Sequence, residues 1–128
     1  MNENRLLDYL RHIQEAVQLA RSYVEGLSKD DFLADNRTQQ AVILNFVIIG
    51  EAATKFLQEH TDFIDRHPDV PWKNMKSMRN RIAHGYFDIN LEIVWDTVQI
   101  ALPQLAEKLL AIQKELNADS CRDLPRFK

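Results

Sequence analysis

The chain has 128 residues, of which 45% are hydrophobic, and its formal net charge is −3. This length suits one domain with its own core, and three glycines and four prolines are too few for the many turns of a β-sandwich or barrel. No apolar run reaches the roughly 18 residues of a membrane span, and no signal peptide is visible, so we expect no membrane association. The single Cys121 cannot form an internal disulfide, which favours a cytoplasmic location.

Positive charge gathers in residues 66–84, whose net charge is +4, whereas the segments before and after are acidic. A mildly acidic protein is no general nucleic-acid binder, but a local basic patch can hold a phosphate. A solvated helix face explains the same charges equally well.

The first predicted helix covers residues 4–26, because apolar side chains recur at alternating steps of four and three. Its apolar stripe comprises Leu6, Leu10, Ile13, Val17, Ala20 and Val24. We expect Gly26 to end this helix and Ser28 to cap one short turn that runs to Ala34.

The second predicted helix covers about residues 37–59 and is the most apolar segment of the chain. A helix that is apolar nearly all round must be covered on nearly all sides, so we expect part of it to meet another protomer. Gly50 would let a neighbouring helix approach closely. Glu51 is interpreted as a hydrogen-bonding residue between helices rather than as a catalytic acid.

Residues 60–70 are predicted to form a connection with at most one turn of helix. His60 and His67 suggest a metal site, but seven residues on a helix span about 10 Å, too far to share one ion. Pro68 also disfavours a continuous helix between them. We therefore expect no metal.

A short helix is predicted to start at Pro71 and to end by Gly85. Its expected buried side chains are Trp72, Met75, Met78 and Ile82, and its expected exposed ones are Lys73, Lys76 and Arg79.

Asn90 is expected to cap a last long helix, in which Pro103 removes one backbone donor and produces a kink. Its inward positions are Leu91, Val94, Trp95, Val98, Leu102, Leu105, Leu109, Ile112 and Leu116. The sequence thus predicts an all-α bundle of about four main helices over residues 1–117, followed by a loose polar tail at residues 118–128.

The segment that carries chemistry is residues 79–86, which read Arg-Asn-Arg-Ile-Ala-His-Gly-Tyr. On a continuous helix Arg79 and His84 lie about 140° apart, too far around to act on one group. A left-handed Gly85 would double the chain back and return Tyr86 toward the Arg79 face. A histidine that titrates near neutrality beside arginines suits phosphodiester cleavage. From spacing alone, His84 could equally cap carbonyls, Arg79 pair with an acidic neighbour, and Tyr86 anchor a turn.

These residues resemble the signature of the HEPN superfamily: an Arg, four intervening residues of which the first is often Asn, a His, one residue and a Tyr. The flanking segments are similar to those of the HepT-like toxin family within it. They are Ile49-Gly50-Glu51-Ala52, Val70-Pro71-Trp72, Met78-Arg79-Asn80, Ala83-His84-Gly85-Tyr86, and Val94-Trp95 followed by Leu102-Pro103.

This resemblance implies a HEPN-type bundle and a metal-independent ribonuclease toxin that needs no cofactor. It implies a homodimer whose RNA cleft lies between two copies of the motif, with Arg79 and His84 catalytic and Asn80 in support. It also implies a nucleotidyltransferase antitoxin of the MntA type, which silences the toxin by attaching AMP to Tyr86. Whether dimers assemble further with the antitoxin stays open, as do the RNA substrate and the division of acid and base roles between the two His84 copies.

Two other interpretations fit the sequence. The chain could be a catalytically inert HEPN module that binds a nucleotide or RNA and partners a nucleotidyltransferase. It could also be a helical interaction protein in which residues 79–86 only end a helix. An adjacent nucleotidyltransferase gene would favour the ribonuclease toxin or the inert HEPN module over the interaction protein. Toxicity on expression would then separate the toxin from the inert module.

Overall fold

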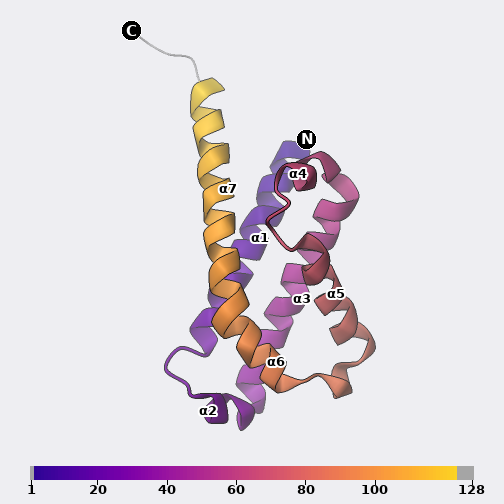
Figure 1. Cartoon of the computed structure of the whole chain (residues 1–128), viewed down its shortest axis with the longest axis vertical. Helices are drawn as coiled ribbons and strands as arrows, with labels where there is room; N and C mark the ends of the chain where they lie inside the picture. Colours follow the sequence, from indigo (N-terminus) through magenta and orange to yellow (C-terminus); the bar gives the residue numbers. More distant parts are fainter. Residues whose placement is uncertain (1, 124–128) are drawn as a thin grey trace.

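The computed structural model describes residues 2–123 and confirms an all-α bundle, with no strand in that range. Four long helices form its frame: α1 (Asn2–Tyr23), α3 (Asn36–Glu59), α5 (Trp72–His84) and α7 (Leu102–Asp123). The connections contain α2 (Lys29–Leu33), α4 (Thr61–Arg66), a 3-10 turn (Tyr86–Asp88), α6 (Leu91–Asp96) and a π-helical segment (Thr97–Ala101). Figure 1 shows α2 and α6 at one end of the bundle and α4 at the other.

The central element is α3, which packs against α1 on one side and α5 on the other (Figure 1). By length and mean hydropathy α3 alone, among the described helices, could cross a membrane, but half of its apolar window is buried inside the bundle. It is thus the core helix of a helical domain. The predicted stripe of α1 is confirmed, since Leu10, Ile13 and Val17 are fully buried.

Side-chain caps fix where α2 and α3 begin. Ser28 and Asp31 form a reciprocal capping box at α2, as the predicted cap required. At α3 the Asp35 carboxylate accepts hydrogen bonds from the Thr38 hydroxyl at 2.5 Å and from its backbone N–H at 3.1 Å. These bonds favour the charged carboxylate and lower the pKa of Asp35 below its ordinary value of 3.8.

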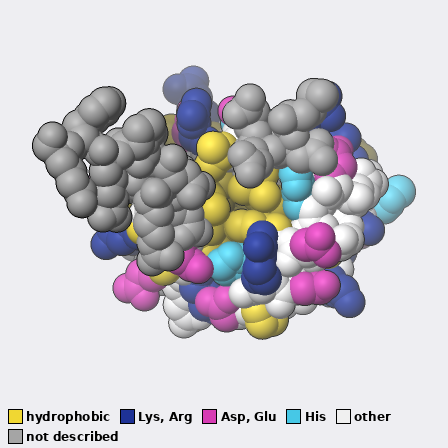
Figure 2. Space-filling model, turned by 90° about the horizontal axis from the view of Figure 1, so that it is seen from above, with side chains coloured by type: hydrophobic (Ala, Val, Ile, Leu, Met, Phe, Trp, Pro, Cys, Tyr) yellow, Lys and Arg dark blue, Asp and Glu magenta, His cyan; other side chains and the backbone are white. Residues whose placement is uncertain are grey.

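The connection after α3 contains more helix than expected, because α4 has six residues where at most one turn was predicted. An aromatic cluster explains its order: the Phe56 ring lies 5.4 Å from that of Phe63 and 4.7 Å from that of Trp72. The Trp72 indole also donates a hydrogen bond to the His67 carbonyl. Figure 2 looks onto this end of the bundle, where hydrophobic side chains lie next to histidines and charged side chains lie nearby.

The kink predicted at Pro103 is realised as a π-helical segment directly before α7. In an α-helix the Pro103 ring would clash with the carbonyl four residues earlier, and the wider turn relieves that clash. Asn90 caps α6 as predicted, since its side chain accepts from the N–H groups of Glu92 and Ile93.

The last helix extends further than the sequence suggested. The segment from residue 118 was expected to be loose, but α7 continues to Asp123. The rest of the expected tail, residues 124–128, lies outside the described residues. Apolar packing along α7 reaches Ile112, which is buried, and Leu116, which is half-buried.

Candidate active site on helix α5

The backbone of α5 lies directly against α3 at Gly50. A Cβ atom at Gly50 would meet the Cβ of Arg79 at a distance that real contacts never show, and would lie 2.8 Å from the Met75 carbonyl oxygen. The predicted close approach at Gly50 is therefore confirmed. Its consequence is that the side chain of Arg79 starts at the surface of α3.

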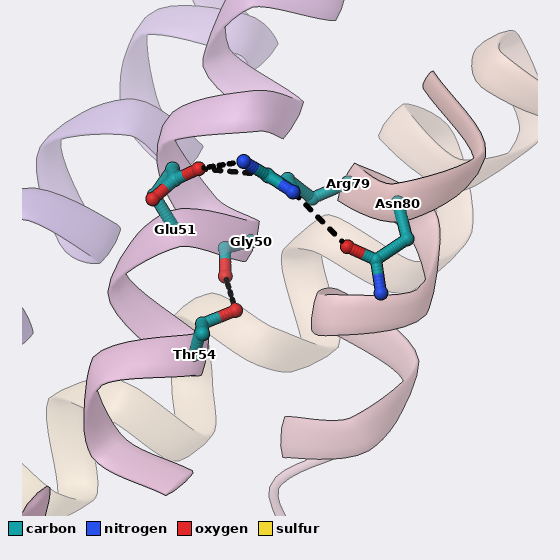
Figure 3. A network of polar contacts seen from close by, with 5 residues as sticks. All are labelled: Gly50, Glu51, Thr54, Arg79 and Asn80. Carbon is teal, nitrogen blue, oxygen red and sulfur yellow. Dashed lines mark hydrogen bonds and ion pairs between the residues drawn. The ribbon is translucent and has the colours of Figure 1, made fainter. Parts of the chain in front are cut away.

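The guanidinium of Arg79 is held from two sides, as Figure 3 shows. Its Nε and Nη2 lie 2.7 and 2.6 Å from one carboxylate oxygen of Glu51 on α3. Its Nη1 donates to the side-chain oxygen of Asn80 at 3.2 Å. The Arg79 side chain is 35% exposed, so the prediction that it faces solvent was only partly right. Three of its five N–H groups are engaged, and two are left for a ligand.

His84 is the last residue of α5 and its side chain is exposed. Within residues 5–118, whose side chains are described, no hydrogen bond to its imidazole is found. Because α5 is continuous from Trp72 to His84, His84 points about 140° away from Arg79. A single chain therefore does not bring the two predicted catalytic residues together.

Gly85 does not adopt the left-handed conformation that the sequence suggested. Its φ is −147°, and the only glycine with positive φ in the described chain is Gly26, at 79°. The chain leaves α5 through the 3-10 turn instead, with Asp88 N–H donating to the Gly85 carbonyl. The helix therefore ends in a 3-10 turn and not in the left-handed glycine that was expected to turn the chain back toward Arg79.

Tyr86 projects from that 3-10 turn and is 46% exposed. Its ring makes an edge contact with Phe87, at 6.0 Å between centroids, but Phe87 is itself 99% exposed. The pair is not anchored in the core, and Tyr86 does not stack on Trp72, whose ring contacts are with Phe56 and Phe63. The phenol is therefore accessible from solvent.

A mainly apolar cavity of about 470 Å³ lies beside His84, between the end of α5 and the start of α6. Ile82, Ile93 and Phe46 line its apolar part, and Arg81 joins His84 at its edge. Arg81 is exposed and lies on the His84 side rather than on the Arg79 side.

Sequence reasoning missed the pairing of Glu51 with Arg79. Glu51 was expected to hydrogen-bond between helices, which is confirmed, but its partner was not identified. The available signal was the adjacent Gly50, since the residue after a helix-contact glycine lies beside whatever packs on it. Among the described residues no three His, Cys, Asp or Glu side chains gather as metal ligands would.

Comparison with known proteins matches residues 13–112 to the family described as "Ribonuclease HepT-like". The protein named "Probable ribonuclease HepT" of Thermococcus cleftensis is 37% identical over 107 residues, which cover 84% of this chain and 94% of that protein. "Putative RNase MJ0127" of Methanocaldococcus jannaschii is 37% identical over 114 residues, covering 89% of this chain and 88% of the relative. No solved structure gives a significant match. With its HEPN-type bundle and its intact Arg79–His84–Tyr86 motif, this chain belongs to the HepT-like ribonuclease family.

Proposed function

We propose that this chain is a metal-independent endoribonuclease and the toxin of a type VII toxin–antitoxin system. It acts in the cytoplasm on RNA, at a cleft between two copies of the chain, and needs no cofactor. The observation that carries the proposal is the family match, which spans the whole motif from Arg79 to Tyr86.

The chemistry follows from the residue types in the motif. A base removes the proton of a 2′-hydroxyl, whose oxygen attacks the adjacent phosphorus, and an acid protonates the departing 5′-oxygen. The products are a 2′,3′-cyclic phosphate and a 5′-hydroxyl. Histidine suits both proton transfers near neutral pH, and Arg79 would stabilise the charge that develops on the phosphorane. Asn80, through its contact with Arg79, would help to orient that guanidinium.

A second copy of the chain would supply what one protomer lacks. Arg79 and His84 diverge on α5, and each chain offers one motif histidine for two proton transfers. On α3, Leu44 and Ile48 are 59% and 38% exposed, and their spacing places them on one stripe with Glu51. Pairing of this stripe across a two-fold axis would bury exposed apolar surface and bring both copies of Arg79 to one interface.

The exposure of Tyr86 supports the proposed silencing by a MntA-type nucleotidyltransferase antitoxin. A phenol on the exposed 3-10 turn after α5 can enter the active site of another protein. Attachment of AMP there would add a phosphate next to a basic segment and compete with the RNA backbone. We expect intact mass spectrometry after co-expression to show added AMP on the peptide with Tyr86, and none in Tyr86→Phe.

The principal test is induced expression of the wild type beside His84→Ala and Arg79→Ala, with growth and RNA integrity as readouts. We expect both variants to lose toxicity and RNA cleavage while remaining folded. His12→Ala, which removes another exposed histidine from α1, is the matched control and should stay toxic. Cleavage by purified protein should continue in a chelator. A folded His84→Ala protein that cleaves RNA at the wild-type rate would overturn the assignment.

One observation favours the catalytically inert HEPN module as a second candidate. Glu51 partly offsets the charge of Arg79, which would weaken its stabilisation of the charge on a phosphorane. In that case purified wild type would bind RNA or a nucleotide without degrading RNA, and its expression would not slow growth.

A further inference from the structure

We propose that Glu51 is a positioning residue for Arg79: its carboxylate fixes the guanidinium so that its free N–H groups face the scissile phosphate. This inference rests on the proposed ribonuclease function, since it assigns Arg79 a ligand. It concerns a residue on a different helix from the motif, 28 positions away in the chain.

The geometry of the contact supports an orienting role. One oxygen of Glu51 accepts from both Nε and Nη2, at 2.7 and 2.6 Å, so it binds the planar guanidinium along the edge formed by these two nitrogens. Asn80 accepts from Nη1, so all three nitrogens of the group have a partner. A planar group held at all three nitrogens cannot rotate freely. The two remaining N–H groups then have fixed directions, which is what paired recognition of phosphate oxygens needs.

The packing below the contact keeps both residues in register. Gly50 allows the Cβ of Arg79 to lie on the α3 backbone. One helix contact therefore sets the backbone positions of both Glu51 and Arg79. The Thr54 hydroxyl, one turn further along, bonds back to the Gly50 carbonyl at 2.8 Å (Figure 3). The Thr54 hydroxyl therefore uses its proton on the backbone and does not compete with Arg79 for the Glu51 carboxylate.

The exposure of the pair distinguishes orientation from simple stabilisation. The two side chains are 35% and 48% exposed, and ion pairs this accessible to water contribute about 0–1 kcal/mol. A contact of such small stabilising value, placed on a candidate catalytic residue, acts mainly through direction. Small displacements of a catalytic group cost about 100-fold in rate.

The test compares Glu51→Ala and Glu51→Gln in single-turnover cleavage of a short RNA. The amide oxygen of Gln can still accept both N–H groups, whereas Ala cannot. We expect Glu51→Ala to lower the rate of the chemical step about 10- to 100-fold with little change in RNA affinity, and Glu51→Gln to restore most of it. Glu59→Ala is the matched control, because Glu59 is another α3 glutamate with an ion-pair partner elsewhere, Arg5.

A second readout does not depend on activity. In a nitrogen-15 NMR spectrum the Nε–H signal of Arg79 should be resolved and slow to exchange in the wild type and in Glu51→Gln, and lost in Glu51→Ala. Arg79→Ala identifies the signal. Wild-type cleavage by Glu51→Ala, or an unchanged Nε–H signal in it, would overturn the positioning role.

The remaining outcomes separate this inference from the proposed function. Faster cleavage by Glu51→Ala would show that the carboxylate competes with phosphate, and would also overturn the positioning role. If Arg79→Ala cleaves normally, the assignment of Arg79 fails, and Glu51 has nothing to position. If wild type cleaves no RNA, the function fails, and the NMR result alone then shows whether the contact orders the side chain.

Discussion

The two ends of the motif on α5 are built in opposite ways. Arg79 starts from a helix contact so close that only glycine fits opposite it, and its guanidinium has two protein partners. His84, five residues on, lies at the exposed end of the same helix beside an open cavity. One chain therefore holds the Arg79 side chain in place and leaves the His84 side chain open to solvent at the end of α5. Variants at the two ends should differ in stability as well as in activity.

The largest expected effect is on catalysis. His84→Ala should lower RNA cleavage about 10²- to 10⁴-fold and Arg79→Ala about 10²- to 10³-fold, from loss of proton transfer and of charge stabilisation. Thermal unfolding should separate them, because His84 has no described partner to lose and Arg79 has Glu51 and Asn80. Equal losses of stability would contradict the contrast between the two ends.

The next effect concerns the helix contact under Arg79. Gly50→Ala should destabilise the fold by about 1–3 kcal/mol in urea unfolding, since the Met75 carbonyl and the α5 backbone must move. Helix propensity alone predicts the opposite sign, a gain of about 1 kcal/mol. Gly85→Ala is the matched control at the other end of α5: its Cβ would lie 3.4 Å from the nearest atom, so it should fold normally. A more stable Gly50→Ala protein would show that α5 can move away from α3 at little cost in free energy.

A smaller effect is expected on assembly. Leu44→Ser should weaken the proposed dimer and leave the monomer folded, because Leu44 is 59% exposed on α3. Burying one leucine contributes about 1.5–3 kcal/mol, and a two-fold dimer buries two, so the dissociation constant should rise more than about tenfold. Leu110→Ser is the control: it removes a similarly exposed leucine from α7, beside the α1–α7 cavity. Sedimentation that finds equal dimer affinity in both variants would move the interface away from α3.

The smallest effect is a pH dependence at the start of α3. The pKa of Asp35 is lowered in the folded state from its ordinary value of 3.8. The charged carboxylate therefore stabilises the fold at any pH above that ordinary pKa. That contribution is lost as pH falls through the lowered pKa. Asp35→Asn keeps a side-chain cap without a charge, so it should melt slightly below wild type near neutral pH. The difference between the two melting temperatures should shrink in acid. A constant difference from neutral pH to about pH 2 would exclude the carboxylate charge as its cause.

Periodicity was sufficient to predict the long helices, because stripes such as Leu10, Ile13 and Val17 allow no other element. The caps at Ser28 and Asn90 were also predictable, since their side chains act on backbone groups two or three residues away. The pairing of Glu51 with Arg79 was not, because it depends on which helices become neighbours. The predicted conformation of Gly85 was wrong, because a glycine that follows a helix does not have to adopt the left-handed conformation.

The π-helical segment before α7 has a consequence for how this helix tolerates change in length. Leu102 N–H bonds to the Thr97 carbonyl, five residues back, so Thr97–Ala101 holds one residue more per turn than an α-helix would. Deleting one residue here would restore α-helical hydrogen bonding with little rotation of α7, whereas deleting one residue at the start of α7 itself would rotate everything downstream by about 100°. Leu105, Leu109 and Ile112 would then leave the core together. The π-helical segment thus accommodates one extra residue between the apolar stripes of α6 and α7, which look like one continuous stripe in the sequence.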